Sequence, residues 1–261
     1  MTGISIFDLS GKVALVTGGG SGLGRAYCEA LAEFGADVAC VDIAEPGAQE
    51  TVKRLSQYGH KAIAVKVDVS KQNEIKVMVA TVVRELGSLD IVFANAAVLD
   101  KNPARIHELP VEEWDRVSSV NLRGVFLLMQ AVFPIMMQNR SGCFISTASG
   151  TGYWPLPPLE GIYLTPAYVT AKSGVIMLTK LAAKQYGEYG IRANVICPGY
   201  HRTPIIPEQG REKMEEALLN FTPLKRVGLP EDIKGLAVYL ASEASSFVSG
   251  QVFVEDGGFM A

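Results

Sequence analysis

Short apolar segments alternate along this chain with longer segments in which apolar residues recur every three or four positions. The short segments are rich in Val, Ile and Ala, which suits strands buried on both faces, and the longer ones have the period of amphipathic helices. Such alternation is typical of βαβ units, in which helices cover a parallel sheet. We therefore predict an α/β fold, a doubly wound sheet of seven parallel strands with helices on both faces.

The predicted strands cover residues 12–17, 37–42, 61–66, 89–94, 142–147, 191–196 and 251–255. The predicted helices cover residues 23–34, 46–58, 72–86, 111–138, 166–186, 208–219 and 230–241. Pro134 allows for a bend in the fourth helix, because proline lacks the N–H that a helix interior uses. Residues 152–165 are rich in proline and aromatic residues without a clear period, so we expect an ordered loop there.

Length and composition favour a single domain over residues 1–261. The chain is 48% hydrophobic, enough to bury a full core, and no linker interrupts the alternation of elements. The net charge is -3 and the sequence pI is about 5.7, with no run of basic residues. These values argue against nucleic acid as a partner.

Targeting and metal-binding signals are absent from the sequence pattern. The first residues lack a basic stretch followed by an apolar core, and we find no apolar run of the roughly 18 residues that a membrane span needs. The four cysteines are dispersed without a CxxC pair, and no histidines share metal-ligand spacing. We expect a cytoplasmic protein with reduced cysteines and no metal.

A glycine-rich turn joins the first predicted strand to the first predicted helix and reads Thr-Gly-Gly-Gly-Ser-Gly-Leu-Gly over residues 17–24. This context favours a dinucleotide site, since the first turn of a helix offers N–H groups to a pyrophosphate. Gly18 permits the tight turn, Gly22 allows close approach of the backbone to the phosphates, and Gly24 lets the helix pack on the sheet. Ser21 and Leu23 complete the expected contact surface.

Asp42 ends the second predicted strand, where its carboxylate would accept hydrogen bonds from the adenosine ribose and repel a 2′-phosphate. The alternative is an aspartate that only caps the following turn. Ile43 follows it where a phosphate site would need a basic residue, and Arg25 is the one nearby cation in the sequence. We therefore predict NAD rather than NADP as the cofactor.

Tyr168 and Lys172 lie four residues apart on a predicted helix, so both side chains share one face. An ammonium beside a phenol should lower the phenol's pKa and make tyrosine a usable general acid or base. The same spacing also arises when an aromatic ring simply packs under a solvated lysine.

These segments together resemble the short-chain dehydrogenase/reductase family over nearly the whole chain, from about Leu9 to Gly258. The resemblance implies a Rossmann fold and a catalytic tetrad, with Tyr168 and Lys172 joined by Ser149 and by Asn121, the asparagine that holds a proton-relay water. It also implies cofactor contacts beyond the glycine turn, namely Asp68 and Val69 at the adenine, Asn95 and Ala96 after the fourth strand, and Pro198, Gly199 and Thr203 at the nicotinamide carboxamide. Ala94 and Ala97 depart from the family's NNAG segment.

The implied activity is NAD(H)-dependent interconversion of a secondary alcohol and a ketone, with the tyrosine exchanging the proton. Sugars or polyols, cyclic ketones and hydroxysteroids remain open as substrates, as does a non-catalytic NAD(H)-binding regulator on the same fold. Substrate loops are expected at about 150–166 and 200–222. The spacing from Ser149 to Tyr168 is longer than the family's usual spacing, which suggests an insertion in the first loop. Candidate substrate contacts are Thr151, Tyr153, Trp154, Tyr163, Tyr200, His201 and Arg202.

Two apolar segments suggest self-association. Residues 125–137 of the fourth helix and the carboxyl-terminal strand with its tail are unusually apolar, although both could belong to the core. Similar family members pair these elements, so the resemblance implies a homotetramer or a homodimer. His201 and Arg202 could bind a polar or anionic substrate group, or could be a solvated basic pair.

Overall fold

The computed structural model describes residues 5–101, 104–154, 165–206, 208–209 and 211–261. Within them, the strands are β1 (Val13–Thr17), β2 (Asp37–Asp42), β3 (Ala62–Lys66), β4 (Ile91–Ala94), β5 (Gly142–Thr147), β6 (Ile191–Pro198) and β7 (Val252–Glu255). They form one parallel sheet in the order β3-β2-β1-β4-β5-β6-β7. The predicted doubly wound sheet of seven parallel strands is confirmed.

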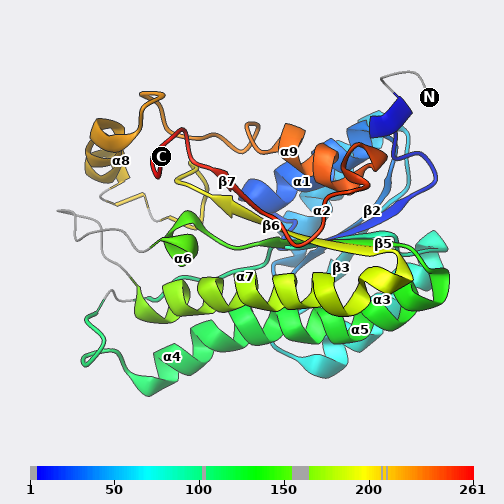
Figure 1. The fold of residues 1–261 in the computed structure, drawn as a ribbon, viewed down its shortest axis with the longest axis horizontal. Helices are drawn as coiled ribbons and strands as arrows, with labels where there is room; N and C mark the ends of the chain where they lie inside the picture. The colour runs from blue at the N-terminus through cyan, green and yellow to red at the C-terminus, as the bar shows by residue number, and fades with distance from the viewer. Residues whose placement is uncertain (1–4, 102–103, 155–164, 207, 210) are drawn as a thin grey trace.

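Helices cover both faces of the sheet (Figure 1). The α-helices are α1 (Gly22–Glu33), α2 (Glu45–Leu55), α3 (Gln72–Leu86), α4 (Val111–Ser118), α5 (Gly124–Asn139), α6 (Gly150–Tyr153), α7 (Pro166–Tyr186), α8 (Arg211–Phe221) and α9 (Lys234–Ala241). One core cluster lies between the sheet and α1, α2 and α9, and a second lies between the sheet and α3, α5 and α7. Successive strands are added on one side of β1 up to β3 and then on its other side from β4 to β7. A doubly wound fold opens a crevice at this switch point, between β1 and β4, at the carboxyl ends of the strands.

Aromatic side chains fill both core layers. Tyr27 of α1 packs on Phe93 of β4 with ring centroids 4.7 Å apart, and both side chains are fully buried. On the other face, Phe133 of α5 meets Phe144 of β5 edge to face at 5.3 Å. Because each large buried side chain contributes about 2 to 3 kcal/mol of transfer free energy, these layers hold α1 and α5 firmly on the sheet.

The predicted helix 111–138 is present but is divided. Residues Ser119–Arg123 form a π-helical turn, η3, between α4 and α5. Pro134 remains inside α5, so the irregularity lies at η3 and not at the proline. Asn121 occupies this turn, which is consistent with the tendency of π turns to occur at functional sites.

The expectation that no apolar segment is long enough to span a membrane was wrong. The run Val111–Asn139 is long and apolar enough to cross a membrane by composition, with a mean hydropathy of 1.6 over its best window. Half of that window is buried inside the protein, where α5 packs against the sheet. Its apolar character therefore reflects a core helix.

The chain after β5 also differs from the prediction. Residues 152–165 were predicted to form a loop, but Gly152 and Tyr153 belong to the short helix α6. Ser149 begins this helix, and its hydroxyl accepts a hydrogen bond from the Thr151 N–H at 3.3 Å. The helix therefore starts at an ordinary N-cap serine. Most of the predicted loop, including Tyr163, lies outside the described residues.

Candidate active site

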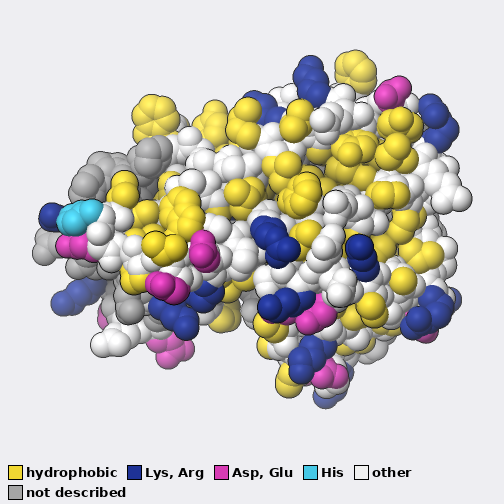
Figure 2. All heavy atoms as spheres, turned by 90° about the horizontal axis from the view of Figure 1, so that it is seen from below, with side chains coloured by type: hydrophobic (Ala, Val, Ile, Leu, Met, Phe, Trp, Pro, Cys, Tyr) yellow, Lys and Arg dark blue, Asp and Glu magenta, His cyan; other side chains and the backbone are white. Residues whose placement is uncertain are grey.

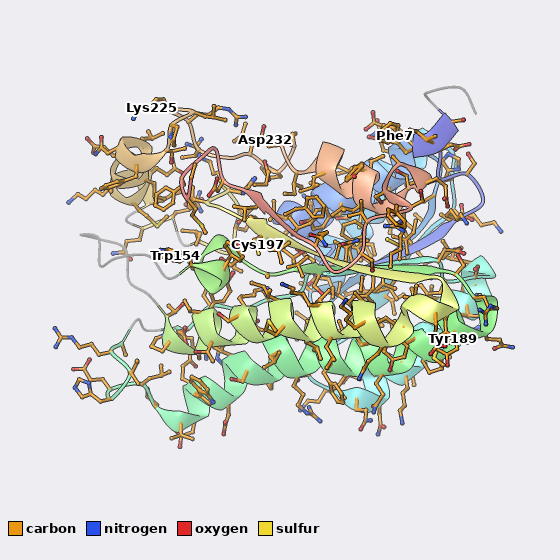
Figure 3. The ribbon with its side chains drawn as sticks, in the orientation of Figure 1. Phe7, Trp154, Tyr189, Cys197, Lys225 and Asp232 are labelled. Carbon is orange, nitrogen blue, oxygen red and sulfur yellow. The ribbon has the colours of Figure 1, made fainter. Side chains whose placement is uncertain are left out.

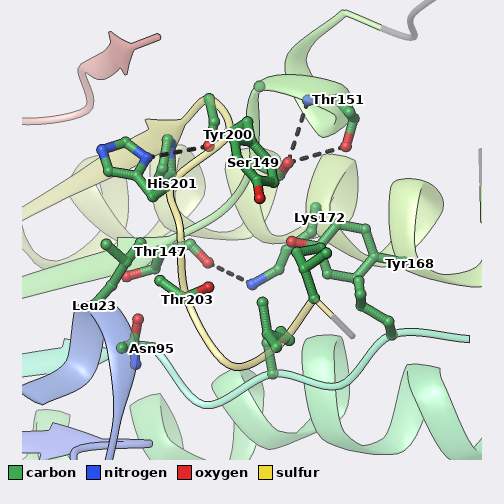
Figure 4. A pocket seen from close by; sticks show the side chains of 18 of the residues that line it. Leu23, Asn95, Thr147, Ser149, Thr151, Tyr168, Lys172, Tyr200, His201 and Thr203 are labelled. Carbon is green, nitrogen blue, oxygen red and sulfur yellow. Dashed lines mark hydrogen bonds between the residues drawn. The ribbon is translucent and has the colours of Figure 1, made fainter. Parts of the chain in front are cut away.

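A large cleft opens at the carboxyl ends of the strands, where the crevice was expected (Figure 4). Its volume is about 1130 Å³. The glycine turn and the end of β2 line one part, while Ser149, Tyr168 and Lys172 line another. All predicted cofactor-binding residues lie in its wall: Gly18, Ser21, Gly22, Leu23, Gly24, Asp42, Asp68, Val69, Asn95, Ala96, Tyr168, Lys172, Pro198, Gly199 and Thr203.

The glycine turn leaves no room for side chains. A Cβ on Gly24 would lie 1.9 Å from the carbonyl oxygen of Gly18, so only glycine fits there. Gly18 and Gly22 have positive φ values of 67° and 50°, which side chains disfavour. A Cβ on Gly22 would lie 3.1 Å from Thr203 across the cleft. The backbone at the start of α1 is therefore bare and close to the opposite wall, as a pyrophosphate site requires.

Asp42 lies at the cleft wall, and both of its oxygens accept backbone hydrogen bonds. Oδ2 accepts from the Gly20 N–H at 2.9 Å and Oδ1 from the Ala44 N–H at 2.8 Å. The capping role is therefore present, and each oxygen keeps a second lone pair for a ribose hydroxyl. Arg25 turns away from a phosphate position, because its guanidinium donates to Thr51 at 3.0 Å and to the Gly20 carbonyl.

Asn95 ties the cofactor end of the cleft to the first strand. Its side-chain amide donates to the Thr17 carbonyl at 3.0 Å, and its own N–H donates to the Thr17 hydroxyl at 3.0 Å. These bonds fix the carboxyl ends of β1 and β4 side by side. The Ala94 and Ala97 departures from the family segment leave this anchoring intact.

Asn121 is completely buried and fixes the loop after β4. Its side-chain Oδ1 accepts a hydrogen bond from the Val98 N–H, and its side-chain Nδ2 donates one to the Val98 carbonyl, both at 2.8 Å. The π turn η3 carries this side chain. Asn121 thus pairs with the chain directly beside the cleft rather than lining it.

Tyr168 and Lys172 enter the cleft from α7, with Ser149 close by (Figure 4). The Lys172 ammonium lies 5.6 Å from the centroid of the Tyr168 ring and donates to the Thr147 carbonyl at 2.6 Å. Burial lowers the pKa of Lys172 to about 8. Burial raises the pKa of Tyr168 to about 12, although its hydrogen bond with Ser149 opposes this change.

This geometry corrects the expectation that Lys172 lowers the pKa of Tyr168. The ammonium is directed at a carbonyl and the ring, and burial determines the proton affinity of the phenol. A tyrosine with a pKa near 12 keeps its proton at neutral pH, and it is a weaker acid than a free tyrosine. The Ser149 hydroxyl also shares a hydrogen bond with the Thr151 hydroxyl at 2.9 Å, which helps to fix its position.

Two of the candidate substrate contacts, Tyr153 and Trp154, do not line the cleft. Tyr153 ends α6 and Trp154 follows it, and the two residues are 54% and 66% exposed (Trp154 is labelled in Figure 3). The short helix α6 ends at Tyr153, and the side chains of both residues are exposed to solvent. The sequence pattern of aromatic and proline residues therefore misidentified the substrate wall at these two positions.

The loop after β6 agrees with the prediction in part, because Tyr200 and His201 line the cleft and Arg202 does not. Arg202 lies outside the cleft wall and pairs with Glu215 of α8 at 2.6 Å, so it is already neutralised. Tyr200 donates to the same carboxylate at 2.7 Å. His201 is buried and lies 3.0 Å from Glu255 of β7, so the alternative of a solvated basic pair is wrong for it.

The cleft has an apolar wall that the sequence predicted only in part, since α8 falls within the expected substrate segment 200–222 and the carboxyl-terminal tail does not. Met214 and Leu218 of α8 and Phe259 and Met260 of the carboxyl-terminal tail line it, although the two segments lie far apart in sequence. Asp100, in the loop after β4, also lines the cleft and was not identified. No local pattern marks these residues, because only the fold brings them together.

Comparisons with known proteins agree with this architecture. A family profile described as enoyl-(acyl carrier protein) reductase matches residues 18–260. Cyclohexanol dehydrogenase of Acinetobacter sp. (strain SE19) is 38% identical over 249 residues, covering 95% of this chain and 94% of that protein. A crystal structure of a short-chain type dehydrogenase/reductase from Mycobacterium marinum has a TM-score of 0.92 and 34% identity, covering 99% of both chains.

A further solved structure, NADPH-dependent 3-quinuclidinone reductase from Rhodotorula rubra, has a TM-score of 0.91 at 31% identity, covering 98% of this chain and 94% of that chain. The chain therefore belongs to the short-chain dehydrogenase/reductase family, and it is an oxidoreductase. Similar proteins act on alcohols and ketones.

Proposed function

We propose that this protein is an NAD(H)-dependent oxidoreductase that interconverts a secondary alcohol and a ketone. The observation that carries the proposal is the grouping of Ser149, Tyr168 and Lys172 in one wall of a cleft whose other end is a bare glycine turn. A proton donor, a hydroxyl for the substrate oxygen and a buried ammonium then face the space beside a dinucleotide site.

The residues of the cleft fit a nicotinamide dinucleotide. The start of α1 would hold the pyrophosphate, and Asp42 would accept hydrogen bonds from the adenosine ribose. Asp68 and Val69 would contact the adenine, while Pro198, Gly199 and Thr203 would contact the carboxamide. When bound, the cofactor would supply or accept the hydride. NAD is favoured over NADP because Asp42 is anionic and Arg25 is engaged elsewhere.

Tyr168 would exchange the proton at the substrate oxygen, and Ser149 would hydrogen-bond the same oxygen as charge develops on it. Tyr168 keeps its proton at neutral pH, so it is present in the acid form that ketone reduction needs. Lys172 would bind the nicotinamide ribose through its buried ammonium. Asn121 would hold the water that leads from Lys172 to solvent with its backbone carbonyl, because its side chain is engaged by Val98.

A cyclic ketone is the substrate class that we favour. Met214, Leu218, Phe259 and Met260 give the cleft an apolar wall suited to a hydrocarbon ring. The similar cyclohexanol dehydrogenase and quinuclidinone reductase are named for ring substrates. Sugars, polyols and hydroxysteroids are the other classes to screen.

We further propose a homotetramer in the cytoplasm. Half of the residues of α5 are buried in the core, but Phe126 is 48% exposed, and Met177 and Leu181 of α7 are exposed as well. The face that bears α5 and α7 carries a broad group of hydrophobic side chains (Figure 2). A second copy of the chain packed on this face would cover them.

The direct test is NADH oxidation with a panel of cyclic ketones, polyols and steroids. We expect loss of NADH absorbance with at least one cyclic ketone such as cyclohexanone. Tight NADH binding without turnover of any member would favour the non-catalytic regulator instead. Equal turnover with every class would contradict the preference for a ring substrate.

The pH dependence of ketone reduction should follow Lys172. Since burial lowers the pKa of Lys172 to about 8, its charge is present below that pH and is lost above it, while Tyr168 stays protonated. We expect kcat/KM to be level from pH 6 to about 8 and to fall at higher pH. In Lys172→Arg the decline should disappear, and a wild-type profile level to pH 10 would contradict the assignment.

A further inference from the structure

Side chains of α4 and η3 form hydrogen bonds with the backbone of the loop after β4 at several successive residues. Asn121 binds both backbone groups of Val98, and Arg116 of α4 donates to the Leu99 carbonyl at 2.6 Å. Glu113 of α4 accepts from the Lys101 N–H at 2.5 Å. The backbone on both sides of Asp100 is therefore fixed, and its side chain becomes part of the cleft wall.

The Asp100 carboxylate is 6% exposed and lies at the start of the helix that carries Tyr168. Its Oδ2 accepts from the Tyr168 N–H at 3.4 Å. Helix α7 has few other means of capping, because Thr165 makes no side-chain cap hydrogen bond and Pro166 has no N–H. Asp100 thus caps α7 from a distant part of the chain.

The second oxygen of the same carboxylate has no hydrogen-bond partner among the residues that the structure describes. Oδ1 is buried and receives no hydrogen bond from any described group of the protein. Leaving a buried acceptor unpaired costs about 1 to 3 kcal/mol, so such atoms commonly serve a function. The charge of Asp100 already faces the positive end of α7 and the nearby Arg116 guanidinium, so a neutral donor is enough to complete the site.

We propose that Asp100 forms a second polar subsite of the cleft, which accepts a hydrogen bond from a hydroxyl group other than the one that reacts. The substrate would then be a cyclic diol, or the corresponding hydroxyketone, rather than a simple cyclic alcohol. The apolar wall would contact the ring, Ser149 and Tyr168 the reacting oxygen, and Asp100 the second oxygen. This inference rests on the proposed dehydrogenase activity and adds a preference for cyclic diols over simple cyclic alcohols.

The test is the ratio of kcat/KM for cyclohexane-1,2-, 1,3- or 1,4-diol to that for cyclohexanol, with NAD. Wild type should favour the best diol by about tenfold or more. Asp100→Asn keeps an oxygen to cap Tyr168 but replaces the free acceptor with an NH₂ donor. The variant should lose at least tenfold in this ratio while cyclohexanol turnover stays within threefold. Asp115→Asn, at an exposed aspartate of α4, is the matched control.

Three results would overturn the subsite. They are a wild-type enzyme with no diol preference, an unchanged ratio in Asp100→Asn, and an equal loss with both substrates, which would leave Asp100 as a helix cap alone. If no alcohol is oxidised, the proposed activity fails, and calorimetric titration of the NAD-loaded protein with each diol decides the subsite. Tighter diol binding to wild type than to Asp100→Asn would support it, and equal binding or none would reject it.

Discussion

Replacing Tyr168 with phenylalanine should lower kcat for ketone reduction by about a thousandfold while NADH binding changes little. The substitution removes only the hydroxyl that donates the proton, and general acid catalysis contributes a factor of this order. The ring would keep its position on α7 and its contact with the Lys172 ammonium. The measurement is steady-state NADH oxidation together with NADH fluorescence titration.

Tyr153→Phe is the matched control, because Tyr153 lies close to Ser149 in sequence but is exposed outside the cleft. It should retain wild-type kcat. If Tyr168→Phe keeps more than a tenth of wild-type turnover, Tyr168 does not supply the proton. If the same variant loses NADH binding to the same degree as turnover, its role is structural.

Changing the end of β2 should reverse the preference between NAD and NADP. In the double variant Asp42→Asn with Ile43→Arg, the carboxylate that would repel a 2′-phosphate is replaced by a neutral amide. The side chain at position 43, which is 63% exposed at the cleft, becomes a guanidinium. We expect the ratio of kcat/KM for NADH to that for NADPH to fall by about a hundredfold.

Asp37→Asn is the control for this pair, because Asp37 begins the same strand at the end far from the cleft. It should leave the cofactor ratio unchanged. A wild-type enzyme that already prefers NADPH would contradict the assignment, as would a double variant whose ratio moves by less than threefold. The NADPH-dependent relative makes this the most informative test of the cofactor.

Local patterns were sufficient to predict the sheet. The strands at 37–42 and 142–147 and the helices at 72–86 and 166–186 have the bounds that periodicity predicted. Buried parallel strands produce uninterrupted apolar runs, and glycine marks several helix ends, so both signals are local. The glycine turn and the Tyr168–Lys172 pair were also predicted from spacing within single segments, whereas Ser149 and Asn121 were predicted from the resemblance to the family.

The substrate end of the cleft could not be predicted in this way. The wall formed by α8 and the carboxyl-terminal tail joins segments that meet only through the order of β6 and β7. Tyr153 and Trp154 had the composition of a binding wall, yet α6 turns them outward. Asp100 was missed because a single aspartate in a loop carries no periodic signal until its neighbours in α4 and α7 are known.

The proton affinities of the site also depend on tertiary burial. The four-residue spacing of Tyr168 and Lys172 correctly placed them on one face of α7. It did not indicate that burial would raise the pKa of the phenol and lower that of the ammonium, because both shifts come from the packing around α7.

The transfer of deuterium from NADH to a ketone tests the central claim most directly. The protein would be incubated with cyclohexanone and NADH deuterated at nicotinamide C4, using each of the two C4 epimers separately, and the product analysed by mass spectrometry. The account predicts cyclohexanol carrying one deuterium at the carbinol carbon with one epimer only. NADH binding without any labelled alcohol, from cyclohexanone or from any other cyclic ketone of the panel, would contradict the proposed hydride transfer.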